Sequence, residues 1–209
     1  MGAGLMEPLS KQQLRIQETQ TRLLDAAADI FVRDGYEAAQ LDEIAAKAGR
    51  SKGAVYTHFT SKEDLFLALF EHRTRSYIEI LVTSLGQCNS RKQSMQAFRD
   101  FYVNLVNDRT WPILTLEFKL FALRHPRWKE RLRKAFELAK PPREDADKRK
   151  LFGNLTVNQA RDNDLAIAAL GPILSGLLLE SHFEPELLSE KGLKQIVGRV
   201  FDSLFPEVL

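Results

Sequence analysis

Side chains suited to contact with a sugar-phosphate backbone gather in the short segment 50–62. They comprise two hydroxyls, an ammonium, a phenol and an imidazole, from Ser51, Lys52, Tyr56, Thr57 and His58. Gly53 lies among them, and a glycine inside a helix costs about 1 kcal/mol relative to alanine, which is understandable if another molecule must approach the backbone. The N-terminus of a helix beginning here would also direct N–H groups and a partial positive charge at a phosphate. The residue types therefore suit DNA.

Positive charge is concentrated in the same segment. Between Ile44 and Lys62 there are four basic residues and no acidic one: Lys47, Arg50, Lys52 and Lys62. Residues 1–75 as a whole carry ten basic and eleven acidic side chains, and the full chain of 209 residues has a formal net charge of +2. Bulk charge thus indicates neither nucleic acid nor membrane, and only local clustering could. The alternative is that Gly49 and Gly53 are ordinary turn glycines and the basic run is a solvated helix face.

Apolar residues at helical spacing predict the elements that position these groups. A first helix is expected over Thr19–Asp34, with Gly35 as its stop. A second short helix should end at Gly49, and Ser51 should cap a third that buries Val55 and Phe59. A long fourth helix is expected to begin with a capping-box-like start at Ser61, with Asp64 in place of the usual Glu or Gln. The second and third helices, joined by a glycine-containing turn, read as a helix-turn-helix.

The rest of the chain is predicted to be helical as well, because no alternation typical of strands occurs in it. Pro112 and Pro126 fit first-turn positions of successive helices, and Pro141-Pro142 should break the next one. The polar stretch 143–161 is expected to be partly loop, followed by two final helices at about 164–182 and 185–204. The fold class is therefore all-α.

Composition excludes several classes of protein. Hydrophobic residues at 44% and charged residues at 28% are ordinary for a soluble globular chain. One cysteine, Cys88, excludes an intrachain disulfide and a multi-cysteine zinc site. The four histidines lack metal-ligand spacing, and no phosphate loop or nucleophile elbow occurs, so no metal, cofactor or enzyme activity is expected. The longest apolar run, Leu170–Leu179, is too short to span a bilayer, and without a secretory signal we expect a cytoplasmic protein with no membrane partner.

The N-terminal residues resemble the TetR (tetracycline-repressor-like) family of bacterial transcriptional regulators over about residues 19–75. The resemblance is carried by Thr21 to Ala27, Phe31, Gly35-Tyr36, Ile44-Ala45, Ala48-Gly49, Ser51 to Tyr56, His58-Phe59, Ser61-Lys62 and Leu65. The run Ser-Lys-Gly-x-x-Tyr-x-His-Phe-x-Ser-Lys is the most specific part. The resemblance implies a DNA-binding domain at 17–75, with its motif at about 41–60, and a helical ligand-binding and dimerisation domain at 76–209.

Carried over residue by residue, the resemblance assigns a DNA-binding set. Ser51, Lys52, Tyr56, Thr57 and His58 would face DNA, Gly53 and Ala54 would allow close approach, and Lys62 would meet phosphate. Two positions depart from the family pattern. Gln40 stands where Ser or Thr usually caps the second helix and contacts phosphate, and glutamine caps poorly. Arg50 replaces a residue that is commonly apolar, and could contact a phosphate or a base.

In the second domain an aromatic cluster is the candidate ligand site that the resemblance implies. Its members are Phe98, Phe101, Tyr102, Trp111, Phe118 and Phe121. Asn104, Glu117 and Arg124 would be polar partners of a ligand. The alternative is that the rings fill a helical core. The segment Arg124–Lys150 holds eleven basic and five acidic residues, and it either binds an anionic ligand or is a solvated surface.

The last two helices are expected to form a two-fold dimer interface of four helices. Small and apolar residues would supply it: Ala169, Pro172, Leu174, Ser175, Gly176, Leu178, Val197, Val200, Phe201 and Leu204. The alternative is burial within one subunit. Together these features predict a homodimeric regulator that binds a near-palindromic operator as a repressor and is released by a small-molecule effector. The alternative function is a helical dimeric scaffold or small-molecule-binding protein with a degenerate DNA-reading head.

Overall fold

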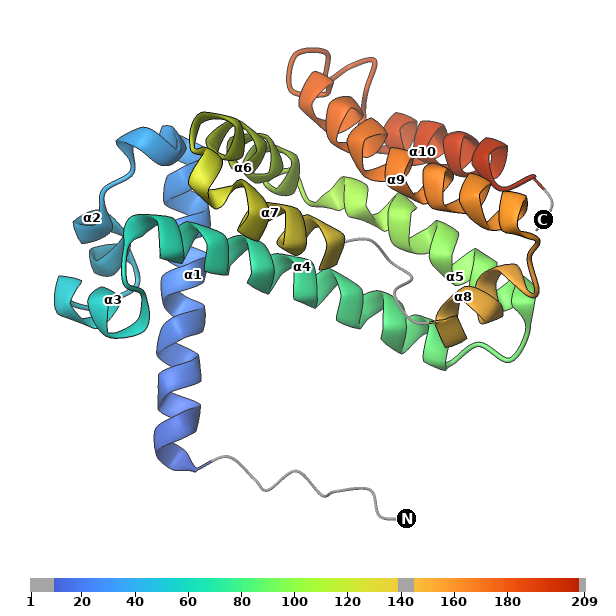
Figure 1. The fold of residues 1–209 in the computed structure, drawn as a ribbon. Helices are drawn as coiled ribbons and strands as arrows, with labels where there is room; N and C mark the ends of the chain where they lie inside the picture. Colours follow the sequence, from blue (N-terminus) through green and yellow to red (C-terminus); the bar gives the residue numbers. More distant parts are fainter. Residues whose placement is uncertain (1–9, 139–144, 207–209) are drawn as a thin grey trace. The chain divides into compact units, whose positions relative to one another are not determined.

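The computed structural model describes residues 10–138 and 145–206, and every regular element within them is a helix (Figure 1). The predicted all-α fold class is confirmed. In chain order the elements are α1 (Lys11–Ala38), α2 (Leu41–Lys47), α3 (Lys52–His58), α4 (Lys62–Gly86), α5 (Arg91–Asn104), the 3-10 turn η1 (Leu105–Asn107), α6 (Trp111–Arg124), α7 (Pro126–Leu138), α8 (Asp145–Phe152), α9 (Val157–Glu180) and α10 (Glu190–Leu204).

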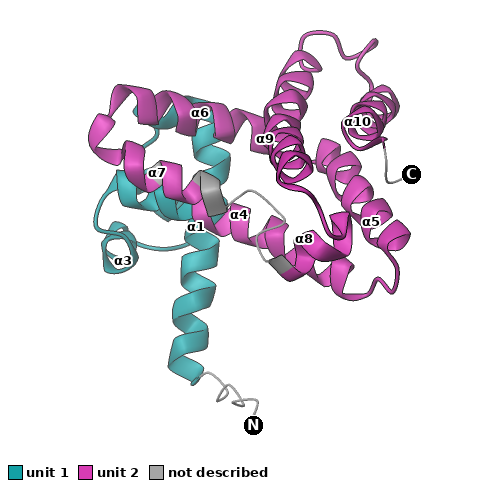
Figure 2. Ribbon diagram, turned by 45° about the vertical axis from the view of Figure 1, so that its right-hand side comes forward, with its two compact units in different colours: residues 1–69 teal, residues 70–209 magenta. Residues whose placement is uncertain are grey.

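The chain divides into two compact units, residues 1–69 and 70–209, with the division inside α4 (Figure 2). Unit 1 contains α1 to α3 and the first two turns of α4, packed around a small apolar core. Phe31 and Phe66 are fully buried there and meet edge to face, with ring centroids 4.7 Å apart. Ile44 of α2, Val55 of α3 and Leu65 of α4 complete the core. Each short helix therefore gains its stability by packing, as expected for elements too short to be stable alone.

Local capping signals set the helix ends of unit 1. Gly35 interrupts α1 with a φ of 74° and Gly49 ends the α2 region with a φ of 65°, a conformation that glycine adopts without steric cost. The first helix is longer than predicted, because Ser10 and Gln13 form a capping box that starts it at Lys11. At the start of α4 the Ser61 hydroxyl accepts from the Asp64 N–H at 3.1 Å, while the Asp64 carboxylate accepts from the Thr60 N–H at 3.0 Å.

Unit 2 is built around α5, which packs against α8 and α10, while α9 packs against α6 and α10. The residues 143–161 were expected to be partly loop, and in the structure α8 occupies 145–152 while 153–156 form a loop. Its last two residues, Leu151 and Phe152, are buried in the core of the unit and hold it in place. Helix α9 begins earlier than predicted because Thr156 and Gln159 form a capping box. The predicted break at Pro141-Pro142 lies outside the described residues.

Candidate functional site

Helix α3 is held in unit 1 by one apolar face and presents the other to solvent. Val55 and Phe59 are buried, and the Ser51 hydroxyl caps the helix by accepting from the Ala54 N–H at 3.3 Å. We define the α3 outer face by its exposed residues: Ser51, Lys52, Gly53, Tyr56 and Thr57. Ala54 and His58 are half-buried at its edges. The structure thus brings together on one surface the residues of α3 that the sequence singled out.

Gly53 is not required by the packing of unit 1. A Cβ built at this position would meet only the Ser51 hydroxyl, at an ordinary contact distance of 3.7 Å. The backbone is also helical there, and its carbonyl accepts from the Thr57 hydroxyl at 3.0 Å. Neither space nor backbone conformation within unit 1 therefore calls for glycine at this position.

The two exposed lysines near α3 are in surface ion pairs. The ammonium of Lys52 lies 3.0 Å from Asp42, and that of Lys47 lies 3.1 Å from Asp29. The hydrogen bond to Asp42 raises the pKa of Lys52, so this ammonium stays charged at neutral pH. Exposed pairs of this kind contribute roughly 0–1 kcal/mol. A polyanion can therefore exchange these carboxylates for phosphates at little cost.

The two departures from the family pattern behave differently. Gln40 occupies the N-cap position of α2 and makes no capping hydrogen bond with its side chain. Arg50 is half-buried, and its guanidinium donates to the Thr19 hydroxyl of α1 at 3.4 Å and to the Gly49 carbonyl at 3.1 Å. Arg50 therefore bridges the helix-turn-helix to α1 within unit 1.

Lys62 departs from the DNA-facing role that the resemblance implied. Its ammonium donates to the carbonyls of Glu37 and Ala39, at 3.0 and 2.9 Å, and lies 4.7 Å from the centre of the Tyr36 ring. Burial lowers the pKa of this lysine. The side chain thus ties the end of α1 to the start of α4. Lys62 points there because the carbonyls at a helix C-terminus attract a cation.

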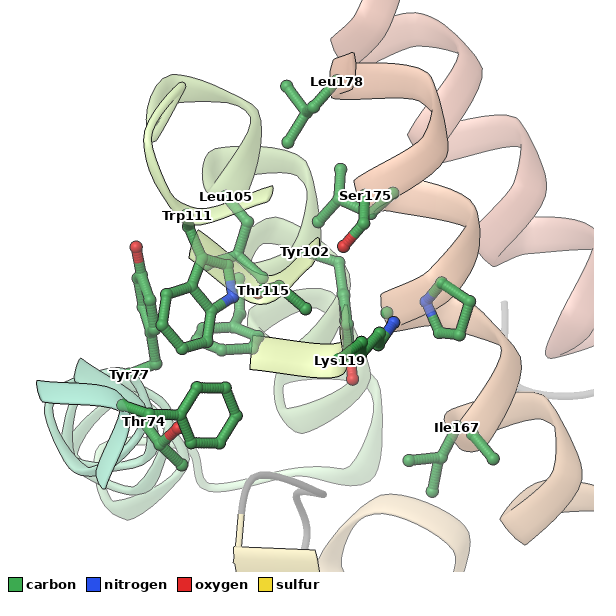
Figure 3. Close-up of a pocket in the computed structure, with 16 residues that line it drawn as sticks. Thr74, Tyr77, Tyr102, Leu105, Trp111, Thr115, Lys119, Ile167, Ser175 and Leu178 are labelled. Carbon is green, nitrogen blue, oxygen red and sulfur yellow. The ribbon is translucent and has the colours of Figure 1, made fainter. Parts of the chain in front are cut away.

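Unit 2 contains a cavity of about 220 Å³ between α4, α5, α6 and α9 (Figure 3). Of the six aromatic residues predicted to bind a ligand, Phe101, Tyr102 and Trp111 line it. The other lining residues are Phe70, Thr74, Tyr77, Leu105, Thr115, Lys119, Ile167, Ala168, Gly171, Pro172, Leu174, Ser175 and Leu178. Sequence reasoning missed Thr115 and Lys119, although they are spaced i, i+4 on α6 and so share one face.

The other three aromatic residues were predicted to bind a ligand, but they lie in the core and do not line the cavity. Phe98 is fully buried and meets the rings of Phe201 and Phe205 at centroid distances of 5.4 and 6.0 Å. Phe118 packs edge to face on Phe70 at 4.5 Å. Phe121 is buried beside His125. For these rings the alternative of a filled helical core applies.

The predicted polar partners of a ligand also lie elsewhere. Asn104, Glu117 and Arg124 do not line the cavity. Asn104 instead lines a neighbouring groove between α4 and α5 that shares Tyr77, Phe101 and Leu105 with the cavity.

A carboxylate, that of Asp108, is hydrogen-bonded to two residues of the cavity wall. Asp108 accepts from the Tyr77 hydroxyl, from Arg73 at 2.9 Å and from the Trp111 N–H at 3.0 Å. Burial acts to raise the pKa of Asp108, but these hydrogen bonds, one from Thr110 and the charge of Arg73 hold it below its ordinary value. Burial, followed by the bond to Asp108, raises the pKa of Tyr77. The network therefore links α4 to the N-terminus of α6.

Helix α9 has two apolar faces, and the predicted dimer set mixes them. Leu174, Leu178, Val197 and Phe201 are at most 5% exposed and belong to the core of unit 2, so they leave the predicted interface. Ala169, Ser175, Val200 and Leu204 are half-buried, and Pro172 and Gly176 are exposed. The outer face of α9 also includes two residues that the sequence reasoning missed, Leu165 at 62% and Ile173 at 37% exposure. Their spacing with Ala169, Pro172 and Gly176 could have identified them.

Three basic residues of the segment Arg124–Lys150 are in ion pairs within the described part of the chain. Arg133 bonds Glu130 at 2.8 Å, Arg131 lies 3.5 Å from Glu71, and Lys148 lies 3.4 Å from Asp164. Residues 139–144 of this segment lie outside the described residues. Within 10–138 and 145–206, no group of three or more His, Cys, Asp or Glu residues is placed to hold a metal ion.

A family model of bacterial regulatory proteins, the tetR family, matches residues 23–69, which cover α2, α3 and parts of α1 and α4. The transcriptional activator FasR of Mycolicibacterium smegmatis is 38% identical over 88 residues, which are 40% of this chain and 40% of FasR. The chain thus matches less than half the length of this relative.

Solved structures extend the likeness in fold to both units. FadR of Bacillus subtilis, in complex with stearoyl-CoA, has a TM-score of 0.63 at 19% identity, covering 88% of this chain and 96% of that one. A transcriptional regulator from Saccharomonospora viridis, in complex with choline, has a TM-score of 0.68 at 17% identity, covering 89% and 96%. Residues 23–69, which contain the helix-turn-helix, therefore belong to the tetR family of bacterial regulatory proteins, and beyond them the likeness to solved structures is one of fold.

Proposed function

We propose that this protein is a sequence-specific DNA-binding transcriptional regulator that places α3 in the major groove of its operator. The observation that carries the proposal is the α3 outer face, a polar helix surface anchored in unit 1 by the buried side chains of Val55 and Phe59. It combines hydroxyl, phenol and ammonium groups with a glycine that the fold itself does not need. Side chains of this kind serve both phosphate and base-edge contacts.

We infer that the regulator acts as a homodimer in the cytoplasm, joined through the outer face of α9 and the adjoining residues of α10. By length and composition α9 could cross a membrane, and only 28% of its apolar window is buried within the chain. The small residues Ala169 and Gly176 would instead let a second copy approach closely. Two-fold symmetry would set two α3 helices about 34 Å apart, or a multiple of that, on a near-palindromic operator.

We further propose that a small molecule in the unit 2 cavity lowers the affinity for DNA, so that the protein acts as a repressor released by its effector. FadR of Bacillus subtilis with stearoyl-CoA and the Saccharomonospora viridis regulator with choline are proteins of this fold that hold small molecules. By linkage, a ligand that weakens DNA binding by some factor has its own binding weakened by DNA by the same factor.

The test is selection of bound fragments from a random DNA library by the purified protein, followed by sequencing. A two-fold symmetric motif is expected. Lys52→Met should weaken binding to that motif, whereas Lys92→Met, an exposed lysine on α5, should leave it unchanged. Recovery of no motif by folded, dimeric protein would favour the scaffold function instead.

Salt dependence tests which cations meet phosphate. Arg50 and Lys62 are engaged inside unit 1, so Lys47 and Lys52 are the basic side chains near α3 free to exchange partners. Two contacts from each copy predict a slope of log K against log salt of about −3.6, whereas all four residues from each copy would give about −7.

A further inference from the structure

Two buried hydroxyls in the cavity of unit 2 have no hydrogen-bond partner within the described part of the chain. Thr74 on α4 and Thr115 on α6 both line the cavity and are 3% and 6% exposed. Among the described residues neither hydroxyl oxygen has a partner. A buried, unsatisfied polar group costs roughly 1–3 kcal/mol, so a fold that retains two of them facing one cavity is suited to a ligand that supplies the partners.

Thr115 and Lys119 lie one helical turn apart on α6 and both line the cavity (Figure 3). Thr115 is buried and Lys119 is exposed, so a hydroxyl and an ammonium follow each other from the interior of the cavity toward solvent. A carboxylate accepts hydrogen bonds from both kinds of donor, and bonds between ionised partners are about twice as strong as neutral ones. This pair therefore favours a carboxylate at the end of the cavity nearest Lys119.

The charge of the lining points the same way. The 16 lining residues, all within the described part of the chain, include one cation, Lys119, and no carboxylate. A quaternary ammonium ligand such as choline would meet a like charge, and none of these lining residues is an Asp or Glu that could pair with it. The cavity is thus suited to an anion.

The walls of the cavity are aromatic, and its volume is small. Trp111 stacks on Phe70 at a centroid distance of 5.3 Å and meets Tyr77 edge to face at 5.5 Å. Phe101 and Tyr102 line the cavity from α5. Aromatic rings prefer offset-stacked or edge-to-face partners. A volume of about 220 Å³ lies below the 300–1,000 Å³ usual for drug-sized ligands, which favours a single-ring molecule over a long acyl chain.

We propose that this cavity binds a small aromatic carboxylate that carries a second hydrogen-bonding group, such as a ring hydroxyl. The carboxylate accepts from Thr115 and Lys119, and the second group bonds Thr74 on the other helix. The ring lies among Trp111 and its aromatic neighbours. This assignment of the ligand class rests on the proposed function, because it takes the cavity to be the effector site of the regulator.

The experiment is calorimetric titration of the full chain, without DNA, with a matched series of probes. 3-(4-Hydroxyphenyl)propionate should bind most tightly. 3-Phenylpropionate, which lacks the hydroxyl, and 3-(4-hydroxyphenyl)propionamide, which lacks the charge, should each bind about tenfold more weakly. Octanoate and choline should bind more weakly still. Equal affinity for the acid and the amide, tighter binding of octanoate or choline, or no binding of any probe would overturn the proposal.

Isosteric variants assign each bond to its residue. Thr115→Val and Lys119→Met should each lower the affinity for the acids about tenfold and lower the affinity for the amide less. Thr74→Val should weaken the hydroxylated acid and leave 3-phenylpropionate unchanged. Thr83→Val on the exposed side of α4 and Lys129→Met on α7 are the matched controls. Should a variant fail to fold, the probe series on the unsubstituted protein still decides the question.

The two proposals fail separately. Binding of the aromatic acid by a chain that selects no DNA motif would refute the proposed regulator and keep the ligand class. Selection of a symmetric motif by a chain whose affinity for the acid and the amide is equal would refute the ligand class and keep the regulator.

Discussion

The two units place their polar groups in opposite ways. In unit 1 the ammonium groups nearest α3 lie on the surface, where Lys47 and Lys52 are paired with exposed carboxylates. In unit 2 the hydroxyls of Thr74 and Thr115 are buried in an aromatic cavity and have no hydrogen-bond partner in residues 10–138 and 145–206. The first arrangement loses little when it exchanges one anion for another, whereas the second gains by receiving a ligand.

This difference predicts two kinds of binding. Contacts made by exposed charges release counterions, so DNA affinity should fall steeply with salt. Bonds formed inside a cavity are screened much less, so the affinity for a small carboxylate should change little over the same range.

Phe98→Ala should cost unit 2 about 3–5 kcal/mol, because it deletes a fully buried ring from the core. Phe101→Ala removes a half-buried ring from the cavity wall and should cost less than half as much. Urea unfolding followed by tryptophan fluorescence measures both, since Trp111 and Trp128 lie in unit 2. Equal losses of unfolding free energy would contradict the assignment of Phe98 to the core and of Phe101 to the cavity wall.

Lys62→Met should destabilise unit 1 by about 1–3 kcal/mol, because two carbonyls at the end of α1 lose a charged donor. Hydrogen exchange of the amides in residues 11–69 localises the effect. Lys47→Met removes only an exposed ion pair and should change stability by less than about 1 kcal/mol. If instead Lys62→Met leaves hydrogen exchange unchanged but abolishes DNA binding, Lys62 has the phosphate contact that the resemblance implies.

Unit 1 was predicted closely because its signals are short-range. Gly35, Gly49 and Ser51 each act within a few residues, so the interruption of α1, the end of α2 and the start of α3 can be read from the sequence. Val55 and Phe59 share a face at i, i+4, which fixes the inner side of α3 and therefore the outer side. The partners of Lys52 and Lys62 could not be predicted, since Asp42 and the carbonyls of Glu37 and Ala39 become neighbours only when the helices pack.

Unit 2 was predicted less closely because its decisions are long-range. An aromatic stripe shows that one side of α5 is buried, but it does not show that Phe98 meets the core while Phe101 meets a cavity. Helix α9 is apolar on two sides, and the pattern alone does not say which side α6 and α10 cover. Leu174 and Leu178 were therefore assigned to an interface although they lie in the core.

Gly53→Ala should separate stability from DNA binding in unit 1. Because the added methyl meets only the Ser51 hydroxyl at 3.7 Å, the helix should gain about 0.5–1 kcal/mol. Operator affinity should fall by about tenfold, the equivalent of one lost contact, if the backbone approaches a phosphate at this glycine. Thermal unfolding and a titration with the selected operator measure the two effects. Unchanged operator affinity would show that Gly53 is not part of the DNA-binding surface.

Asp108→Asn should flatten the acid dependence of unit 2, which is the smallest effect of the four. Hydrogen bonds and the charge of Arg73 hold the pKa of Asp108 below its ordinary value of 3.8 in the folded chain. The stability that this carboxylate contributes is therefore complete above about pH 4 and is lost as the pH falls through its folded pKa. Urea midpoints between pH 2 and 7, read from tryptophan fluorescence, should fall less steeply for the variant below pH 4. Asp162→Asn, an exposed carboxylate on α9, should keep the original slope, and an identical slope for both variants would show that the Asp108 network does not stabilise the cavity wall through its charge.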